Sequence, residues 1–147
     1  IDSAAGIEAG FRNAAAGADE ALVVTTPEVS AVRDADRIIG LLESMEKAPI
    51  SLIINRIKPE MVKRGEMLAI QDVLDILAVE LIGAIPDDES VVTSSNKGEP
   101  LTFSNGSLAT RAFLTISKRI SGNDVPFMDL SANHKGFFSS LRRIFGS

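Results

Sequence analysis

The sequence predicts an α/β fold with a parallel sheet, because short apolar segments alternate with amphipathic helical patterns along the chain. Residues 20–25, 50–55 and 81–85 each contain an apolar run, and the continuous run in residues 20–25 is expected of a buried parallel strand. The 147 residues, 45% of them hydrophobic and 24% charged, have the size and composition of one globular domain. We therefore expect a substantial buried core.

Helical signals fill the segments between these strands. Thr26 is suited to cap a helix, because a proline and a glutamate follow it. The same helix has an apolar face formed by Val32, Ala35, Ile39, Leu42 and Met45. A polar connection over residues 56–66 precedes a helix over residues 69–78. Asn105 is expected to cap a last helix that runs to Ile120.

The chain is expected to consist of a domain over residues 1–120, a linker over 121–135 and a terminal segment over 136–147. The linker is mostly polar, and its large apolar residues are expected to hold it against the domain: Phe127, Met128 and Leu130. Three strands are few for a sheet of this kind. A strand ending at Ile1 would make a fourth, and the sequence is expected to be a fragment of a longer chain.

Residues 136–147 predict an amphipathic helix with one continuous apolar face. That face contains Phe137, Phe138, Leu141, Ile144 and Phe145, while Arg142 and Arg143 lie off it. A helix that lies in a membrane interface needs bulky apolar anchors on one side and basic groups on the other. The alternative is a helix that packs on its own domain or on a partner protein.

The charge distribution favours a membrane surface over nucleic acid. The net charge is −5, but residues 131–147 contain three cations and no acid, so the remainder carries −8. A nucleic-acid partner requires a basic face, so none is expected, whereas a basic tail suits an anionic lipid surface. The chain has no cysteine, and no apolar run approaches the roughly 20 residues of a membrane span.

Five segments and the apolar face of residues 136–147, which is called the terminal stripe below, follow one another in a characteristic order along the chain. They are Asp2-Ser-Ala-Ala-Gly-Ile-Glu8, residues 26–38, Asn55-Arg56, Gly83-Ala-Ile-Pro-Asp-Asp88 and residues 95–100. Together they resemble the MinD family, a deviant Walker A group of P-loop ATPases, over nearly the whole chain. The resemblance implies the C-terminal half of a three-layer α/β/α P-loop NTPase domain, followed by an amphipathic helix.

The resemblance also implies roles for single residues. Asp2 would help to hold Mg²⁺ through water. The nucleotide would contact Asn55, Arg56, Pro86, Asp87 and Asp88. The regulators MinC and MinE would bind the helix at Ser30, Arg33, Asp34 and Asp36. An anionic membrane would receive Phe137, Phe138, Leu141, Arg142, Arg143, Ile144 and Phe145.

Each role has a plainer alternative. The alternative for Asp2 is an ordinary aspartate in a turn that caps a helix from Gly6. The alternative for Asn55 is a turn residue without a ligand. Residues 86–88 are otherwise a helix entry, since an aspartate is favoured in the first turn. The charged residues of the partner helix are otherwise a solvated face with weak ion pairs.

Two departures from the family pattern limit the activity expected of this chain. No Gly-x-x-x-x-Gly-Lys-Ser/Thr loop occurs in the 147 residues, so we expect no ATP hydrolysis by this chain alone. The proline that the family has after Asp-Ser is Ala4 here, which loosens the switch segment. ATP and Mg²⁺ are therefore expected only in the intact protein, which would form an ATP-dependent homodimer.

The function implied is that of a membrane-cycling ATPase that positions the division septum of a cell or plastid. It would work in the cytoplasm at the inner membrane face, or in the plastid stroma at the inner envelope. One alternative is a non-catalytic adaptor that docks on membranes. Another is a ParA-like ATPase that partitions DNA, which the acidic body and the aromatic tail disfavour.

Overall fold

The centre of the molecule is a three-stranded parallel sheet in the order β1-β2-β3. The computed structural model describes residues 1–3, 6–103, 106–128 and 130. Its strands are β1 (Ala21–Thr25), β2 (Ile50–Ile57) and β3 (Glu80–Pro86). The crossovers contain helices: α2 (Val29–Ser44) in the first, α3 (Pro59–Lys63) and α4 (Ile70–Leu77) in the second. The predicted parallel α/β fold is confirmed.

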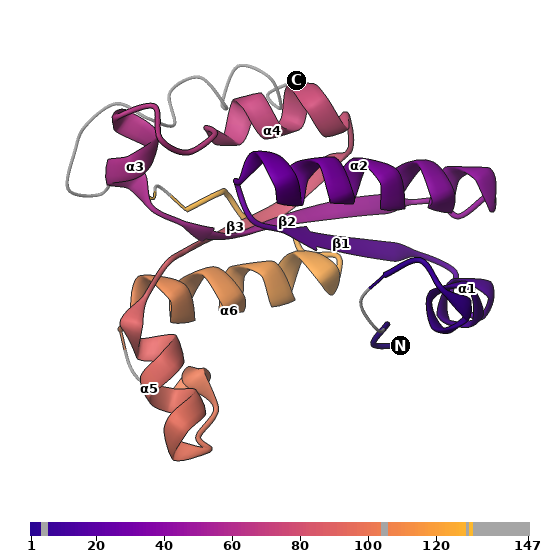
Figure 1. Cartoon of the computed structure of the whole chain (residues 1–147). Coiled ribbons are helices and arrows are strands. Elements are labelled where there is room, and N and C mark those ends of the chain that lie inside the picture. Colours follow the sequence, from indigo (N-terminus) through magenta and orange to yellow (C-terminus); the bar gives the residue numbers. More distant parts are fainter. Residues whose placement is uncertain (4–5, 104–105, 129, 131–147) are drawn as a thin grey trace.

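The alternation of side chains along β2 divides the interior into two layers of packing. Leu52 and Ile54, both fully buried, join one cluster with residues of α2 and α4. Ile53 points to the opposite face and joins a second cluster with α6 (Leu108–Ile120). Figure 1 shows α2 and α4 on one side of the sheet and α6 on the other, so the three-layer arrangement is present.

Two further parts lie outside this sandwich. Helix α1 (Ala9–Ala16) packs beside β1 through its buried face, and Lys47 Nζ donates to the carbonyl oxygens of Ala16 at 3.2 Å and Ala18 at 3.0 Å. Helix α5 (Glu89–Lys97) and the 3₁₀ turn η1 (Leu101–Phe103) project away from the sheet (Figure 1). Of the helices in the described residues, none has the length and apolar character needed to cross a membrane.

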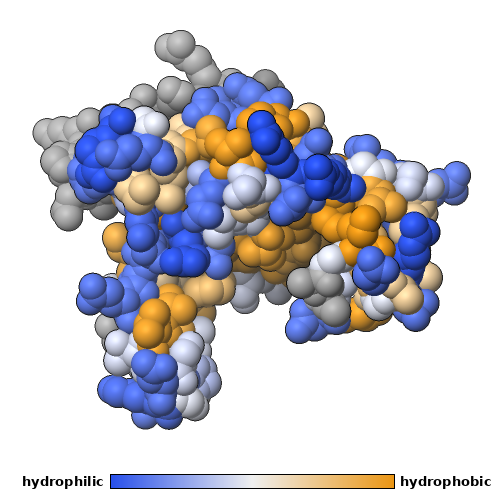
Figure 2. Space-filling model, viewed as in Figure 1, coloured by the Kyte–Doolittle hydropathy of each residue, from blue (hydrophilic) through white to orange (hydrophobic). Residues whose placement is uncertain are grey.

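Strand β1 is less buried than the sequence predicts. Leu22 and Val24 are 44% and 59% exposed, because α6 covers β3 and part of β2 but does not reach β1. A groove of about 520 Å³ runs between α1, β1 and α2, and apolar side chains gather over β1 on the surface in Figure 2. The buried-strand prediction is therefore right for only one face of β1.

Two helices begin later than the sequence predicts. Helix α2 starts at Val29 and its N-cap is Glu28, since Pro27 is buried and its carbonyl accepts a hydrogen bond from Leu68 N at 3.2 Å. The predicted start at Thr26 is therefore wrong. The cap of α6 is Ser107, whose Oγ accepts a hydrogen bond from Thr110 N at 3.0 Å, and not Asn105.

Other boundaries differ for local reasons. The polar connection over 56–66 contains α3, which has proline at its first helical position, where the missing N–H costs nothing. The strand that would end at Ile1 is not formed in the described residues 1–3. Helix α1 begins at Ala9, so Asp2 is not its cap.

The start of the linker lies against the domain as predicted. Leu130 is buried in the larger core cluster, and Phe127 and Met128 pack against it. The predicted amphipathic helix over residues 136–147 lies outside the described residues.

Helix α6 approaches β3 closely because the strand has a glycine at the contact. A Cβ atom on Gly83 would overlap Cγ1 and Cδ1 of Ile116, a buried side chain of α6. A side chain at position 83 therefore fits only if the Ile116 side chain or the helix that carries it shifts. This seam fixes the distance between the sheet and its second helical layer.

We expect Gly83→Ala to destabilise the fold by about 1–3 kcal/mol, because the new methyl group overpacks the seam. Gly40→Ala in α2 is the matched control, since a methyl group added there meets nothing within 4 Å beyond its own helix in the described residues, and alanine favours helix. Urea unfolding of both variants measures the difference. Equal stability of the two variants would contradict the tight seam.

Candidate functional site

The carboxyl ends of the three strands meet at one edge of the sheet, where parallel α/β folds bind ligands. The structure brings all five predicted nucleotide residues to this edge, on adjacent strands: Asn55, Arg56, Pro86, Asp87 and Asp88. Pro86 is buried, Asn55 and Asp88 are half-buried, and Arg56 and Asp87 are exposed. Asn55, Arg56, Asp87 and Asp88 are therefore at least partly accessible to a ligand at this edge, with Pro86 buried beneath the surface.

A β-bulge shapes the β2 side of this edge. Ile54 pairs with Ala84 and Ile57 with Pro86, so Asn55 and Arg56 lie opposite the single residue Ile85. Arg56 has a φ of 57°, a left-handed conformation that is uncommon for a residue other than glycine. Bulges and such backbone outliers are frequent beside binding sites.

The bulge also orients the Asn55 side chain. Its Oδ1 accepts a hydrogen bond from the backbone N of Arg56 at 2.8 Å. Among the bonds within the described residues, none engages its Nδ2 group, which remains a donor for a ligand. Asn55 can thus offer a fixed amide to the edge of a heterocyclic base.

Asp87, just after β3, forms ion pairs with two residues at the end of β2. Its Oδ1 lies 3.5 Å from Arg56 Nε and its Oδ2 lies 3.2 Å from Lys58 Nζ, while its backbone N donates to Ile57 O at 2.9 Å. The pairs are solvent-exposed, so each contributes only about 0.2–1 kcal/mol. Lys58 was not predicted as a site residue, because only the fold brings it to Asp87.

Asp88 caps two helices at once. Its Oδ1 accepts a hydrogen bond from Ser90 N in α5 at 2.9 Å, and its Oδ2 accepts one from Ala109 N in α6 at 3.2 Å. Hydrogen bonding from Ser90 lowers the pKa of Asp88, partial burial opposes the shift, and the Ala109 amide supports it. The predicted alternative of a helix entry is therefore confirmed for Asp88.

Asp2 lies away from this edge. Its neighbours Ile1 and Ser3 line the groove between α1 and β1, and Ile1 Cδ1 approaches Gly17 at the end of α1. The described residues contain no cluster of three or more His, Asp or Glu side chains that could hold a metal ion. Asp2 could supply one Mg²⁺ ligand, but one carboxylate does not make a complete site. Its metal role stays a prediction.

The four predicted partner residues share the exposed side of α2: Ser30, Arg33, Asp34 and Asp36. Asp34 forms an ion pair with Arg37 at 3.7 Å, in which both side chains are more than three-quarters exposed. The seven predicted membrane residues lie outside the described residues. For both sets the assigned role stays a prediction.

The sequence matches a known family over the part of the chain that forms this edge. Residues 2–101 match the CobQ/CobB/MinD/ParA nucleotide binding domain. The chain belongs to this family of nucleotide-binding domains. The matched range contains the three strands, the β-bulge and both aspartates, which agrees with a nucleotide at the carboxyl edge.

Within the family the chain is similar to proteins named MinD. It is 54% identical over 144 residues to the septum site-determining protein MinD of Synechocystis, covering 97% of this chain and 54% of the relative. It is 45% identical over 147 residues to that of Bacillus subtilis, covering 99% of this chain and 55% of the relative. The resemblance to MinD is thereby confirmed.

Solved structures agree with this assignment. The MinD cell division protein of Aquifex aeolicus superposes with a TM-score of 0.82 at 49% identity, covering 86% of this chain and 54% of that chain. In the MinC:MinD cell division protein complex of the same organism, the TM-score is 0.80 at 48% identity, covering 84% and 51%. The chain spans about half the length of the relatives that it matches.

We expect Asp88→Ala to destabilise the protein by about 1–2 kcal/mol, because the first turns of α5 and α6 each lose an acceptor. Asp75→Ala is the control, since Asp75 is an exposed aspartate that bonds only to Gln71 within α4 among the described residues. Denaturant unfolding measures both variants. A cost no greater than that of the control would contradict the double cap.

The contribution of the Asp88 charge to the stability of the fold depends on pH, and it decreases as the pH falls. Its pKa is lower in the folded than in the unfolded protein, so its stabilisation is complete above about pH 4. The stabilisation is lost as the pH falls through the folded-state pKa. The stability difference between the wild type and Asp88→Asn should therefore shrink below about pH 4.

Proposed function

We propose that this chain acts as the C-terminal part of a MinD-type ATPase that places the division septum. The proposal rests on one observation: relatives named septum site-determining protein MinD match 97–99% of the chain at 45–54% identity. The chain would supply the base-binding edge, the partner helix and the membrane tail. The phosphate-binding loop would lie outside these 147 residues.

At the carboxyl edge the chain's own residues would bind and orient the nucleotide. Asn55 would offer its Nδ2 donor and the free lone pair of Oδ1 to the adenine edge. Pro86 would support the base from below, with Asp87 held in place by Arg56 and Lys58. Mg-ATP would supply the phosphoryl group and the energy that changes the state of the protein.

The terminal stripe would attach the protein to an anionic membrane. Burying its five large apolar side chains would contribute about 1.5–3 kcal/mol each, and each of three cations about 1 kcal/mol. Ordering about ten residues costs about 1–2 kcal/mol per residue, which nearly cancels the gain. One tail would thus bind weakly and reversibly.

Two tails on an ATP-dependent homodimer would bind far more tightly. After the first tail inserts, the second has a high effective concentration, which strengthens binding by about 10²- to 10⁴-fold. The nucleotide state would thereby control residence on the membrane. The protein would cycle between the cytoplasm and the inner membrane face, or between the stroma and the inner envelope.

We expect Phe138→Glu or Leu141→Glu in the full-length protein to abolish ATP-dependent co-sedimentation with anionic vesicles. A carboxylate on the apolar face would have to enter the membrane interface. The affinity for ATP should stay unchanged, because the tail is not part of the nucleotide edge. Ser140→Glu is the control, since it adds the same charge off the apolar face. Unchanged sedimentation of the Phe138→Glu variant with the vesicles would contradict the proposed membrane role.

The exposed side of α2 would bind the regulators MinC and MinE. A role for MinC is supported by the similarity of this chain to MinD in the solved MinC:MinD complex. Asp34 and Asp36 are the main candidates, because both carboxylates are exposed and Asp34 has only a weak ion pair.

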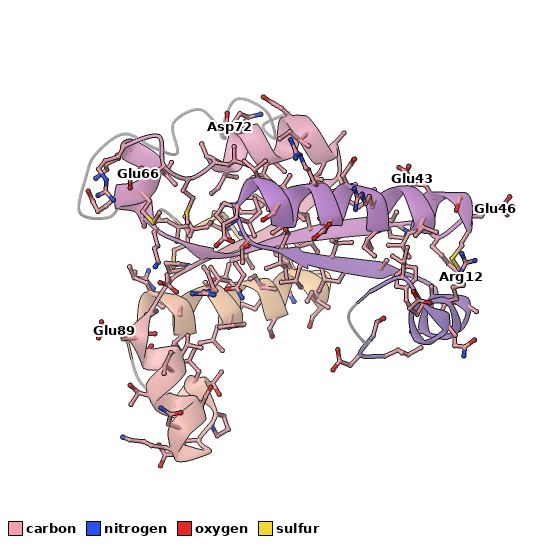
Figure 3. The ribbon with its side chains drawn as sticks, viewed as in Figure 1. Arg12, Glu43, Glu46, Glu66, Asp72 and Glu89 are labelled. Atoms are coloured by element: carbon pink, nitrogen blue, oxygen red, sulfur yellow. The ribbon has the colours of Figure 1, made fainter. Side chains whose placement is uncertain are left out.

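We expect Asp34→Lys to weaken binding of a MinC-type regulator by at least about tenfold, because the proposed interface would pair the Asp34 carboxylate with a basic side chain, and a cation at this position would repel it. Glu43→Lys is the matched control: it makes the same charge change near the other end of α2 (Figure 3). Isothermal titration calorimetry compares the two. Equal losses would place the partner elsewhere on the protein.

Two rival functions give different results in the same assays. A ParA-like partitioning ATPase would sediment with DNA rather than with vesicles, and the −8 charge of residues 1–130 disfavours it. A non-catalytic adaptor would bind vesicles with no dependence on ATP. Sedimentation of the full-length protein with DNA and with vesicles, with and without ATP, separates the three.

A further inference from the structure

Arg119, near the end of α6, joins three segments of the chain. Its Nη1 donates to Ile82 O in β3 at 2.6 Å, and its Nε donates to Val125 O in the linker at 2.9 Å. Its guanidinium carbon lies 3.9 Å from the centre of the Phe127 ring, a cation–π geometry. These four residues are called the Arg119 clasp below.

The clasp is partly withdrawn from water. Arg119 is half-buried, and burial lowers its pKa, an effect that nearby Asp124 partly offsets. Its Nη2 atom is buried and finds no partner among the described residues. A planar guanidinium reaches two carbonyls and a ring at the same time, which a lysine ammonium does not.

The clasp continues into the larger core cluster. Phe127 and Met128 pack against that cluster, and Leu130 is buried within it. The linker therefore does not leave the domain at Ile120, where α6 ends, but stays on it to Leu130. About five residues, 131–135, then remain before the terminal stripe, instead of about fifteen counted from Ser121.

We propose that the Arg119 clasp positions the membrane tail by holding the first part of the linker on the domain, which leaves fewer residues between the domain and the tail. The proposal rests on the membrane function proposed above. Effective concentration falls with roughly the −3/2 power of tether length, so release of the clasp would weaken two-tail binding about fivefold. Binding through a single tail does not depend on this length.

Arg119→Gln in the full-length protein tests the clasp, and Lys118→Gln makes the same charge change on an exposed residue of the same turn. A thiol introduced by Leu130→Cys in each background reports opening, because Leu130 is buried. We expect its alkylation, followed by mass spectrometry, to be at least tenfold faster with Arg119→Gln than with Lys118→Gln. Equal rates would overturn the clasp. If Arg119→Gln does not fold, Phe127→Leu replaces it.

Sedimentation with anionic phosphatidylglycerol vesicles tests the tether. With ATP, Arg119→Gln should bind about fivefold more weakly than Lys118→Gln, whereas with ADP the two should bind alike. Equal loss in both nucleotide states, or no loss in either, would overturn the positioning role. Wild-type protein that binds no vesicles would overturn the membrane function and the tether, while the thiol rates would still decide whether the clasp exists.

Discussion

The close contact between α6 and β3 is the constraint on which both the carboxyl edge of the sheet and the attachment of the linker depend. Gly83 leaves room for Ile116, so α6 lies directly on the sheet. Its first turn then reaches Asp88 at the carboxyl edge, and its last turn places Arg119 beside Ile82 and the linker. A helix held farther from the strand would lose both sets of hydrogen bonds, since they tolerate little displacement.

The carboxyl edge combines rigid support with an accessible surface. Asp88 is engaged by two helices and serves the framework, whereas Asn55 keeps donors for a ligand. The left-handed backbone of Arg56 lies in a bulge between two pairs of strand residues, Ile54 with Ala84 and Ile57 with Pro86. Residues of the candidate site therefore differ in what they contact: Asp88 supports the edge by capping two helices, whereas Asn55 keeps an amide donor that no hydrogen bond within the described residues engages.

Most of the fold could be predicted because the pattern of apolar residues along the chain agrees with which side chains are buried in the structure. The three strands and the apolar face of α2 follow from the order of apolar residues alone. The start of α2 could not be predicted, because a distant segment bonds to Pro27 and keeps the chain extended there. Part of the site was missed for the same reason: Lys58 meets Asp87 only after β2 and β3 pair.

The sequence by itself determined the alternation of strands and helices, the charge contrast between body and tail, and the motifs that place the chain in its family. These properties depend on residues close together in the chain. Only the tertiary structure decided that Asp88 caps two helices, that β1 keeps an uncovered face, and that Arg119 holds the linker. Such contacts join segments brought together by packing, and no local pattern specifies them.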